Sequence, residues 1–242
     1  MTSQKIRQKE PATIQRMFNA IAPRYDVLNH LLSFGLDIVW RKKAVKLIRE
    51  KRNGAVLDLA AGSGDFSLEA KAINPKLIVA SDFATNMYEV FRKKIEGKNL
   101  DGIIHFVACD ALTLPFRSES FDVVMVAFGI RNFADRPAAL REMNRVLRPH
   151  GIVLILELTY PKKPIISQLY TIYSKYFLPF LGRIISRHGA AYSYLPRSIG
   201  EFPENDKFAA LLTETGFTEV IVRSLSFSVA AIFTGRKPSN AK

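Results

Sequence analysis

Short apolar runs alternate with helical patterns through the middle of the chain. Five runs are almost wholly apolar, at residues 55–60, 77–82, 103–107, 121–128 and 152–158. The segments between them space their apolar residues as helices do. Strands that alternate with helices predict a mainly parallel sheet covered by helices, and continuous apolar strands fit burial on both faces.

The ends of two elements can also be read from the sequence. Pro149 and Gly151 are expected to stop a helix at 136–148. Two more strand patterns, at 218–225 and 228–237, lie close together near the end of the chain. A link this short joins strands antiparallel, because a parallel crossover needs about a dozen residues. The sheet is therefore expected to end in one reversed strand.

A glycine turn follows the first predicted strand in the sequence "VLDLAAGSGDF", residues 56–66. Gly62 and Gly64 can adopt backbone angles closed to other residues and let a ligand approach the chain. The third glycine of a dinucleotide fingerprint is missing after Gly64, and the Gly-Lys-Ser/Thr of a P-loop is absent. The turn therefore predicts a nucleotide pocket with only weak signals for a pyrophosphate.

Carboxylates stand at three successive strand ends. Asp58 precedes the glycine turn, Asp82 ends the second strand, where an acid can accept hydrogen bonds from ribose hydroxyls, and Asp110-Ala111 follows the third. Each acid alone could simply cap a helix. Three together, without a paired lysine, suit a cationic nucleoside that carries no phosphate. We therefore expect S-adenosylmethionine as the cofactor.

The charge of the chain is unevenly distributed. The formal net charge is +13, with 12 Lys and Arg against 4 Asp and Glu in residues 1–54, 12 against 13 in 55–159, and 11 against 5 in 160–242. The basic excess lies in the flanks, not around the glycine turn. A basic surface suits nucleic acid, an anionic membrane leaflet or nothing specific.

Other features exclude several classes of protein. No run of 18 apolar residues predicts a membrane-spanning helix, and the N-terminus lacks the apolar region of a secretory signal. Cys109 is a single cysteine, expected to be a small buried residue, and the four histidines (His30, His105, His150 and His188) share no metal-ligand spacing. We expect no metal and a cytoplasmic protein.

Four further stretches carry a specific resemblance. They are "YDVLNHLLSFGLDIVWR" (25–41), "FGIRNFADRPAALREMNRVLRPHG" (128–151), "LYTIYSKYFLP" (169–179) and "AYSYLPRSIGEFP" (191–203). With the glycine turn, they resemble the ubiquinone/menaquinone biosynthesis C-methyltransferase family over roughly residues 14–237. The resemblance implies the class I S-adenosylmethionine-dependent methyltransferase (Rossmann-like) fold, α/β with a seven-stranded, mostly parallel sheet and one antiparallel strand.

The resemblance also implies an activity and site residues. The activity would be ring-carbon methylation of a prenylated hydroquinone. Demethylmenaquinol is the favoured acceptor, and a ubiquinone precursor, 2-polyprenyl-6-methoxy-1,4-benzoquinol, is the alternative. Carried over by motif, the cofactor contacts are expected at Ser63, Asp82, Asp110, Ala111 and Ala127, in addition to Asp58, Gly62 and Gly64.

Departures from the family pattern limit what is carried over. Ala127 stands where relatives often have Ser, so any side-chain hydrogen bond there is lost. Asp37 stands where many relatives have His, and no catalytic histidine is assigned.

Catalysis is predicted to depend on the turn after the fourth strand. A ring carbon is a weak nucleophile until a neighbouring hydroxyl, with a pKa of about 10 like that of Tyr, loses its proton. Arg131 is expected to stabilise the resulting oxyanion, and Asn132 to orient the ring oxygen or a water molecule. A guanidinium is a poor direct base. Tyr25 and Asp26 are lesser candidates for substrate positioning.

The segment at 160–203 is predicted to face the acceptor. Its apolar residues share one face of a helix; they are residues 165, 166, 169, 170, 173, 176, 177 and 180. This face could line a groove, lie on a membrane, pack on the sheet or form the interface of a homodimer. We expect transient contact with the inner face of the cytoplasmic membrane. A nucleic-acid methyltransferase and a non-catalytic partner are the remote rivals, although no basic run is interleaved with aromatic residues.

We expect one methyltransferase domain over residues 1–242. Its parts are an N-terminal helical cap (1–54), a cofactor-binding core (55–159), an insertion facing substrate or membrane (160–203), and a C-terminal helix and hairpin (204–242).

Overall fold

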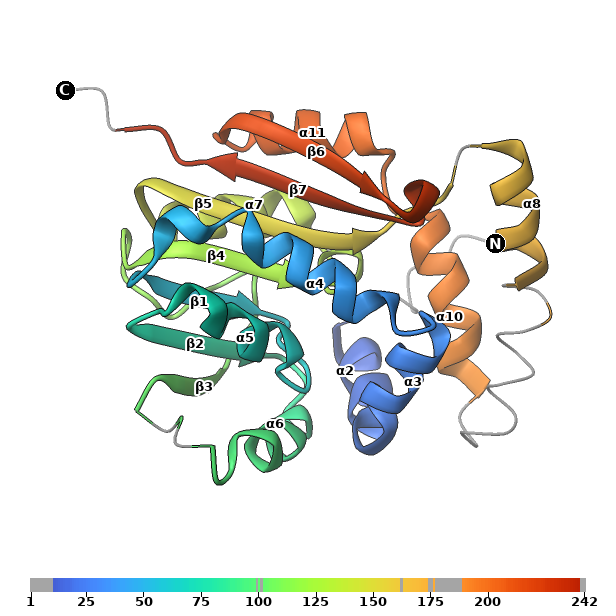
Figure 1. Cartoon of the computed structure of the whole chain (residues 1–242), viewed down its shortest axis with the longest axis horizontal. Helices are drawn as coiled ribbons and strands as arrows, with labels where there is room; N and C mark the ends of the chain where they lie inside the picture. Colours follow the sequence, from blue (N-terminus) through green and yellow to red (C-terminus); the bar gives the residue numbers. More distant parts are fainter. Residues whose placement is uncertain are drawn as a thin grey trace.

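A single sheet forms the centre of the molecule (Figure 1). The computed structural model describes residues 11–98, 100, 102–161, 163–173, 176 and 189–239. Within them the strand order is β3-β2-β1-β4-β5-β7-β6. The first five strands pair in parallel, and β7 runs antiparallel to both of its neighbours. The strands are β1 (Ala55–Leu59), β2 (Leu77–Asp82), β3 (Ile104–Ala108), β4 (Phe121–Ala127), β5 (Leu147–Leu158), β6 (Thr218–Leu225) and β7 (Ala230–Arg236).

The predicted α/β fold with a seven-stranded, mostly parallel sheet is confirmed. The first four strands begin and end within one residue of the predicted apolar runs. The reversed strand is present as well, but β7 lies between β5 and β6, so the sheet does not end on it. The hairpin folds back so that β6 takes the edge.

The boundary between the predicted helix at 136–148 and the next strand was wrong. Helix α7 (Arg136–Val146) ends earlier, and β5 already begins at Leu147, which pairs with Phe121 of β4. Pro149 and Gly151 therefore lie inside the span of β5. The helix ends because Leu147 pairs with β4, two residues before Pro149.

Helices cover both faces of the sheet because the strands alternate their side chains. Val56 of β1 packs with α4 (Leu36–Lys46), α5 (Asp65–Ala70) and α6 (Met87–Ile95) on one face. Leu57, the next residue, packs with α7 and α11 (Asn205–Glu214) on the other. Burial of most residues of the five inner strands β1, β2, β4, β5 and β7 explains their apolar runs, whereas the edge strands β3 and β6 are largely accessible.

The other α-helices of the described residues lie beyond the carboxyl ends of the parallel strands (Figure 1). They are α2 (Pro11–Ile21), α3 (Tyr25–Leu32), α8 (Pro164–Ile172) and α10 (Gly189–Gly200), and the short turn η4 (Ile130–Asn132) follows β4. Ligands of open α/β sheets bind at this edge. Across the described ranges, no helix is both long and apolar enough to cross a membrane. Phe177 and Phe180 of the predicted apolar stripe lie outside the described residues, as does His188.

The glycine turn depends on Gly64 for a steric reason. Gly64 has φ +86°, and a Cβ at this position would lie 2.0 Å from the ring of Phe91 on α6. Gly97 offers a matched comparison, since it also has a positive φ of +72° but no atom lies within 4 Å of the place of its Cβ. The two glycines therefore share the backbone requirement and differ in packing.

We predict that Gly64→Ala destabilises the protein much more than Gly97→Ala. The Gly97 variant should lose about 1 kcal/mol of unfolding free energy from its left-handed backbone. The Gly64 variant should lose about 1–3 kcal/mol more, because the ring of Phe91 is fixed in the core and must shift. Urea unfolding of both variants measures the difference, and equal losses would contradict the packing argument.

Candidate active site

Three cavities meet around the glycine turn and the turn after β4. The first, here the acidic cavity, has a volume of about 100 Å³ and is bordered by Gly62, Asp82, Asp110 and Asn132. The second, the apolar cavity, has a volume of about 310 Å³ and lies among α3, α4, α8 and α10. The third, the small cavity, has a volume of about 10 Å³ and includes Asp58.

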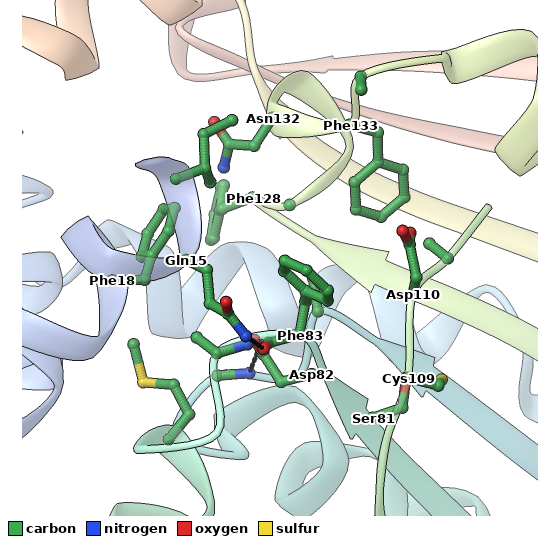
Figure 2. A pocket seen from close by; sticks show the side chains of 18 of the residues that line it. Gln15, Phe18, Ser81, Asp82, Phe83, Cys109, Asp110, Phe128, Asn132 and Phe133 are labelled. Atoms are coloured by element: carbon green, nitrogen blue, oxygen red, sulfur yellow. Dashed lines mark hydrogen bonds between the residues drawn. The ribbon is translucent and has the colours of Figure 1, made fainter. Parts of the chain in front are cut away.

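Asp82 ties the glycine turn to the loop after β2 (Figure 2). Its Oδ2 accepts the backbone N–H of Gly62 at 2.8 Å, and its Oδ1 accepts the N–H of Ala84 at 2.7 Å. Burial raises the pKa of Asp82, and these backbone hydrogen bonds oppose the shift. Each carboxylate oxygen has a second lone pair, so Asp82 can still accept hydrogen bonds from ribose hydroxyls.

Aromatic side chains form the walls of the acidic cavity. Phe18 of α2 stands on one side, and Phe133 stands beside Asp110 on the other (Figure 2). Phe83 lies between them, and its backbone oxygen accepts the side-chain N–H of Gln15 at 2.6 Å. Flat apolar walls beside a carboxylate suit a planar heteroaromatic base.

Several of these lining residues were missed by the sequence analysis. They are Gln15, Phe18, Phe83, Met87, Cys109 and Phe133. Phe83, Cys109 and Phe133 each adjoin a predicted site residue (Asp82, Asp110 and Asn132), and this adjacency was the available signal. Cys109 is half-buried at the cavity, where burial raises the pKa of its thiol. Ala111 also borders this cavity, as the resemblance implied for a cofactor contact.

The other predicted cofactor residues lie beneath the turn. Asp58, Ser63 and Ala127 border the small cavity, which shares Tyr25 and Ala60 with the acidic cavity. Gly64 borders none of the three cavities and instead packs against Phe91.

Asp58 is fully buried and incompletely paired. Its Oδ2 accepts the hydroxyl of Ser67 at 2.6 Å, and its Oδ1 has no hydrogen-bond partner among the described residues. Burial raises the pKa of Asp58 to about 7. An unpaired buried carboxylate oxygen is costly, so a cationic ligand nearby would relieve it.

The two residues predicted to position the substrate have different surroundings. The ring of Tyr25 lies against Gly62 and borders both the acidic and the small cavity. Asp26 borders none of the three cavities and forms an ion pair with Lys94 at 2.7 Å and a hydrogen bond with Ser63. Asp26 thereby holds α3 against the glycine turn. Contact of Tyr25 or Asp26 with a methyl acceptor stays a prediction.

The apolar cavity is lined mainly by apolar side chains, with Asp37 and Arg131 as the charged residues of its described lining. Leu32, Trp40, Leu158 and other apolar residues dominate its wall. Tyr170 contributes a neutral phenol, since burial raises its pKa to about 12. Arg131 places a buried guanidinium at the same wall.

The turn after β4 separates the apolar cavity from the acidic one. Phe128 borders both and has φ +58°, a strained value for a bulky residue. Arg131 borders the apolar cavity, and Asn132 borders the acidic cavity, with its Oδ1 accepting the hydroxyl of Tyr194 at 2.9 Å. The two predicted catalytic residues therefore stand on either side of one wall.

Glu157 fixes Arg131, and the sequence analysis did not find this partner. Glu157 Oε1 accepts Nη1 of Arg131 at 2.7 Å, and Oε2 accepts the backbone N–H of Arg131 at 3.0 Å. Burial alone would lower the pKa of Arg131, but the facing carboxylate outweighs it, and the pKa is raised. Among the described residues, Nη2 of Arg131 has no hydrogen-bond partner, which leaves donors for an oxyanion.

Comparisons with known proteins identify the class and then the family. The fold resembles that of a solved SAM-dependent methyltransferase from Thermotoga maritima, with a TM-score of 0.64, 17% identity and coverage of 92% of this chain and 99% of the other. Residues 4–237 match the ubiE/COQ5 methyltransferase family, and the chain belongs to it.

Two curated relatives are similar over most of their length. A Thermus thermophilus protein named demethylmenaquinone methyltransferase is 45% identical over 92% of this chain and 100% of its own. A Geobacter sulfurreducens protein named ubiquinone/menaquinone biosynthesis C-methyltransferase UbiE is 44% identical over 93% of this chain and 88% of its own. The suspected family is confirmed, and the chain is a methyltransferase.

S-adenosylmethionine is the methyl donor of this class, and the cavities fit it. The acidic cavity has carboxylates at the glycine turn and flat walls, and the unpaired Oδ1 of buried Asp58 lies in the adjoining small cavity. No described phosphate-binding lysine of a P-loop borders either cavity. These features suit a cationic nucleoside without phosphate.

We predict that Asp58 makes the unliganded protein less stable as the pH rises from about 4 to 7. Its folded pKa of about 7 exceeds the ordinary 3.8, so the folded state binds more protons in this window. The loss is at most about 4 kcal/mol. Urea unfolding of wild type and Asp58→Asn at pH 5 and pH 8 measures it. The variant should show a smaller pH dependence, and identical profiles would contradict the prediction.

Proposed function

We propose that the enzyme transfers a methyl group from S-adenosylmethionine to a ring carbon of a prenylated hydroquinone, with demethylmenaquinol as the acceptor and menaquinol as the product. The observation that carries this proposal is the shared wall at Phe128, with the acidic cavity of about 100 Å³ on one side and the apolar cavity of about 310 Å³ on the other. A relative named for demethylmenaquinone supports the menaquinone reading. The relative named for both quinones keeps the methoxy-benzoquinol precursor of ubiquinone as the alternative.

The apolar cavity explains why Arg131 is needed. A ring oxyanion is costly in an apolar site, as the raised pKa values of the half-buried Tyr170 and Tyr173 phenols illustrate. The Arg131 guanidinium, held by Glu157, would stabilise that oxyanion as it forms. Asn132 would orient the ring oxygen or a water molecule from the other side of the wall.

When bound, the donor supplies an electrophilic methyl group and leaves as a neutral thioether, so each turnover replaces one ring hydrogen and releases one proton. The protein contributes position and electrostatics. Phe128 and η4 form the wall between the acidic and apolar cavities, so they would determine how the donor and the acceptor are placed relative to each other. The described lining of the apolar cavity is dominated by carbon, which keeps water away from the reacting ring.

A second part of the proposal places the enzyme in the cytoplasm, in transient contact with the inner face of the cytoplasmic membrane. Several of the described residues with large exposed apolar side chains lie around the apolar cavity. Phe34 lies between α3 and α4, Leu36 begins α4, and Ile165, Leu169 and Ile172 lie on α8. Phe34, Leu36 and Leu169 also line the cavity. A polyprenyl tail could pass from the bilayer into the cavity through this surface.

Basic residues flank the same surface. Lys42, Lys43 and Lys46 are exposed on α4, and Lys163 is exposed immediately before α8. Each lysine near an anionic leaflet contributes about 1 kcal/mol, and this contribution is screened by salt. Membrane binding should therefore combine shallow apolar insertion with reversible charge attraction.

A methyl-transfer assay tests the chemical proposal. The purified enzyme is given S-adenosylmethionine with a labelled methyl group and either a reduced 2-polyprenyl-1,4-naphthohydroquinone or a methoxy-benzohydroquinone with the same tail. We expect label in the naphthohydroquinone product. Label in both products would mean a shared enzyme, and label in neither, with the cofactor still bound, would refute the quinone assignment.

The same assay includes Arg131→Lys, because a lysine keeps the charge but loses the planar fork held by Glu157. We expect kcat to fall about 10²- to 10³-fold, as for other lost oxyanion donors, with cofactor binding unchanged. Arg145→Lys on α7 is the control, since Arg145 pairs with Glu142 and borders none of the three cavities. An unchanged kcat for Arg131→Lys would refute its role.

We predict that the double variant Ile165→Asp/Ile172→Asp reduces binding to anionic liposomes at low salt by about tenfold or more, because two apolar side chains no longer insert. Flotation measures the bound fraction. Ile221→Asp is the matched control, since Ile221 is 51% exposed but lies on β6. Absence of wild-type binding, or equal losses in both proteins, would refute the membrane surface.

A further inference from the structure

Helix α10 packs against η4, the turn that carries the two predicted catalytic residues, and it contains most of the stretch "AYSYLPRSIGEFP" (191–203). Leu195 and Ile199 of this helix border the apolar cavity. Tyr194 and Ser198, the residues directly before them, form hydrogen bonds with η4 instead. Because residues four apart lie on the same face of a helix, α10 presents one face to the apolar cavity and the adjoining face to the catalytic turn.

The hydroxyl of Tyr194 holds the side chain of Asn132. It donates a hydrogen bond to Oδ1 of Asn132 at 2.9 Å, and both residues are half-buried. Burial raises the pKa of Tyr194, so the phenol keeps its proton at neutral pH and can donate it. The two residues are 62 positions apart, and the contact therefore forms only when the chain is folded.

This hydrogen bond fixes which end of the Asn132 amide is free. An asparagine amide has an acceptor oxygen and a nitrogen with two N–H donors, and rotation of the amide exchanges their places. With Oδ1 bound to Tyr194, the N–H groups of Nδ2 have no acceptor among the described residues. Figure 2 shows the nitrogen turned toward the interior of the acidic cavity and the oxygen turned away from it. Asn132 therefore faces this cavity as a hydrogen-bond donor.

A donor at this place suits the charge that forms during methyl transfer. The ring oxygen of the acceptor becomes an oxyanion, which accepts hydrogen bonds and donates none. An amide rotated the other way would direct the partial negative charge of Oδ1 at that oxyanion. The orientation of Asn132 thus decides whether its amide stabilises the developing charge or opposes it.

We infer that Tyr194 is a positioning residue for the methyl transfer, whose hydroxyl holds Asn132 with Nδ2 toward the reacting ring oxygen. Tyr194 borders none of the three cavities, so it acts through Asn132 and not by contact with a ligand. This inference rests on the proposed function, because it requires a ring oxyanion near Asn132. It also narrows the role of Asn132 to the donation of a hydrogen bond.

Ser198, one helical turn after Tyr194, gives Arg131 only weak support. Its Oγ accepts Nε of Arg131 at 3.4 Å, whereas Glu157 accepts two shorter hydrogen bonds from Arg131, at 2.7 and 3.0 Å. Asn132 has no such second support, because Tyr194 is the one hydrogen-bond partner of its side chain among the described residues. Loss of a hydroxyl from α10 should therefore affect Asn132 more than Arg131.

A double-mutant cycle on methyl transfer tests the inference. The assay uses labelled S-adenosylmethionine and whichever of the two hydroquinones wild type methylates. Tyr194→Phe removes only the hydroxyl, and we expect kcat to fall about 3- to 10-fold, the range for one neutral hydrogen bond. The KM for the hydroquinone and the affinity for S-adenosylhomocysteine should stay within about twofold, because the interaction acts in the transition state.

The second half of the cycle separates positioning from a general structural role. Asn132→Ala should lower kcat about 100-fold, as for a lost oxyanion donor. Adding Tyr194→Phe to Asn132→Ala should change kcat by no more than about twofold, because the hydroxyl no longer has an amide to hold. A structural role would instead give the same additional loss in both backgrounds.

A matched variant and a measurement without turnover serve as controls. Tyr88→Phe on α6 should leave kcat unchanged, since the Tyr88 hydroxyl forms no hydrogen bond among the described residues and Tyr88 borders none of the three cavities. Thermal unfolding confirms that each variant is folded. The side-chain amide NMR signals of Asn132, identified by their loss in Asn132→Ala, should shift in Tyr194→Phe and stay in place in Tyr88→Phe.

The outcomes distinguish this inference from the proposed function. An unchanged kcat in Tyr194→Phe, an equal loss in the Asn132→Ala background, or amide signals that do not shift would overturn the role of Tyr194 while the methyl transfer stands. Failure of wild type to methylate either hydroquinone would overturn the proposed function, and this inference with it.

Discussion

The buried ion pair between Arg131 and Glu157 is the interaction on which the arrangement of the two large cavities depends. Glu157 has no exposed surface, and it accepts hydrogen bonds from the Arg131 side chain, the Arg131 backbone and the N–H of Leu158. Loss of one partner of a buried pair typically costs 3–5 kcal/mol, because the other charge stays buried. The last residues of β5 thus fix the turn that follows β4, and with it the wall between the cavities.

The same pair also resolves a conflict between stability and chemistry. A guanidinium in an apolar cavity is costly alone, and a cavity without it could not stabilise an oxyanion. Glu157 neutralises the charge from the side of the sheet, and Nη2 of Arg131 stays without a partner among the described residues. The strained φ of Phe128 also serves the site. The chain turns sharply at this residue, and Arg131 and Asn132 therefore lie on opposite sides of one wall.

The sequence predicted those parts of the fold and site that depend on local patterns. Strand ends followed from continuous apolar runs, and Gly62, Asp82 and Asp110 followed from their places after those strands. What it could not predict depends on partners far along the chain. Glu157 lies in the predicted strand at 152–158, and nothing in that run indicates that its side chain contacts Arg131, 26 positions away. Leu147 was predicted to lie in the helix at 136–148, but it pairs with Phe121 and is the first residue of β5.

Helix α3 connects all three cavities, although it is only eight residues long. Its first residue, Tyr25, borders the acidic and small cavities, while Asn29 and Leu32 border the apolar one. Asp26 fastens the same helix to Ser63 and Lys94 at the glycine turn. One short helix therefore supplies side chains to all three cavities. The place of α3 against the glycine turn sets part of the lining of the acidic, small and apolar cavities together.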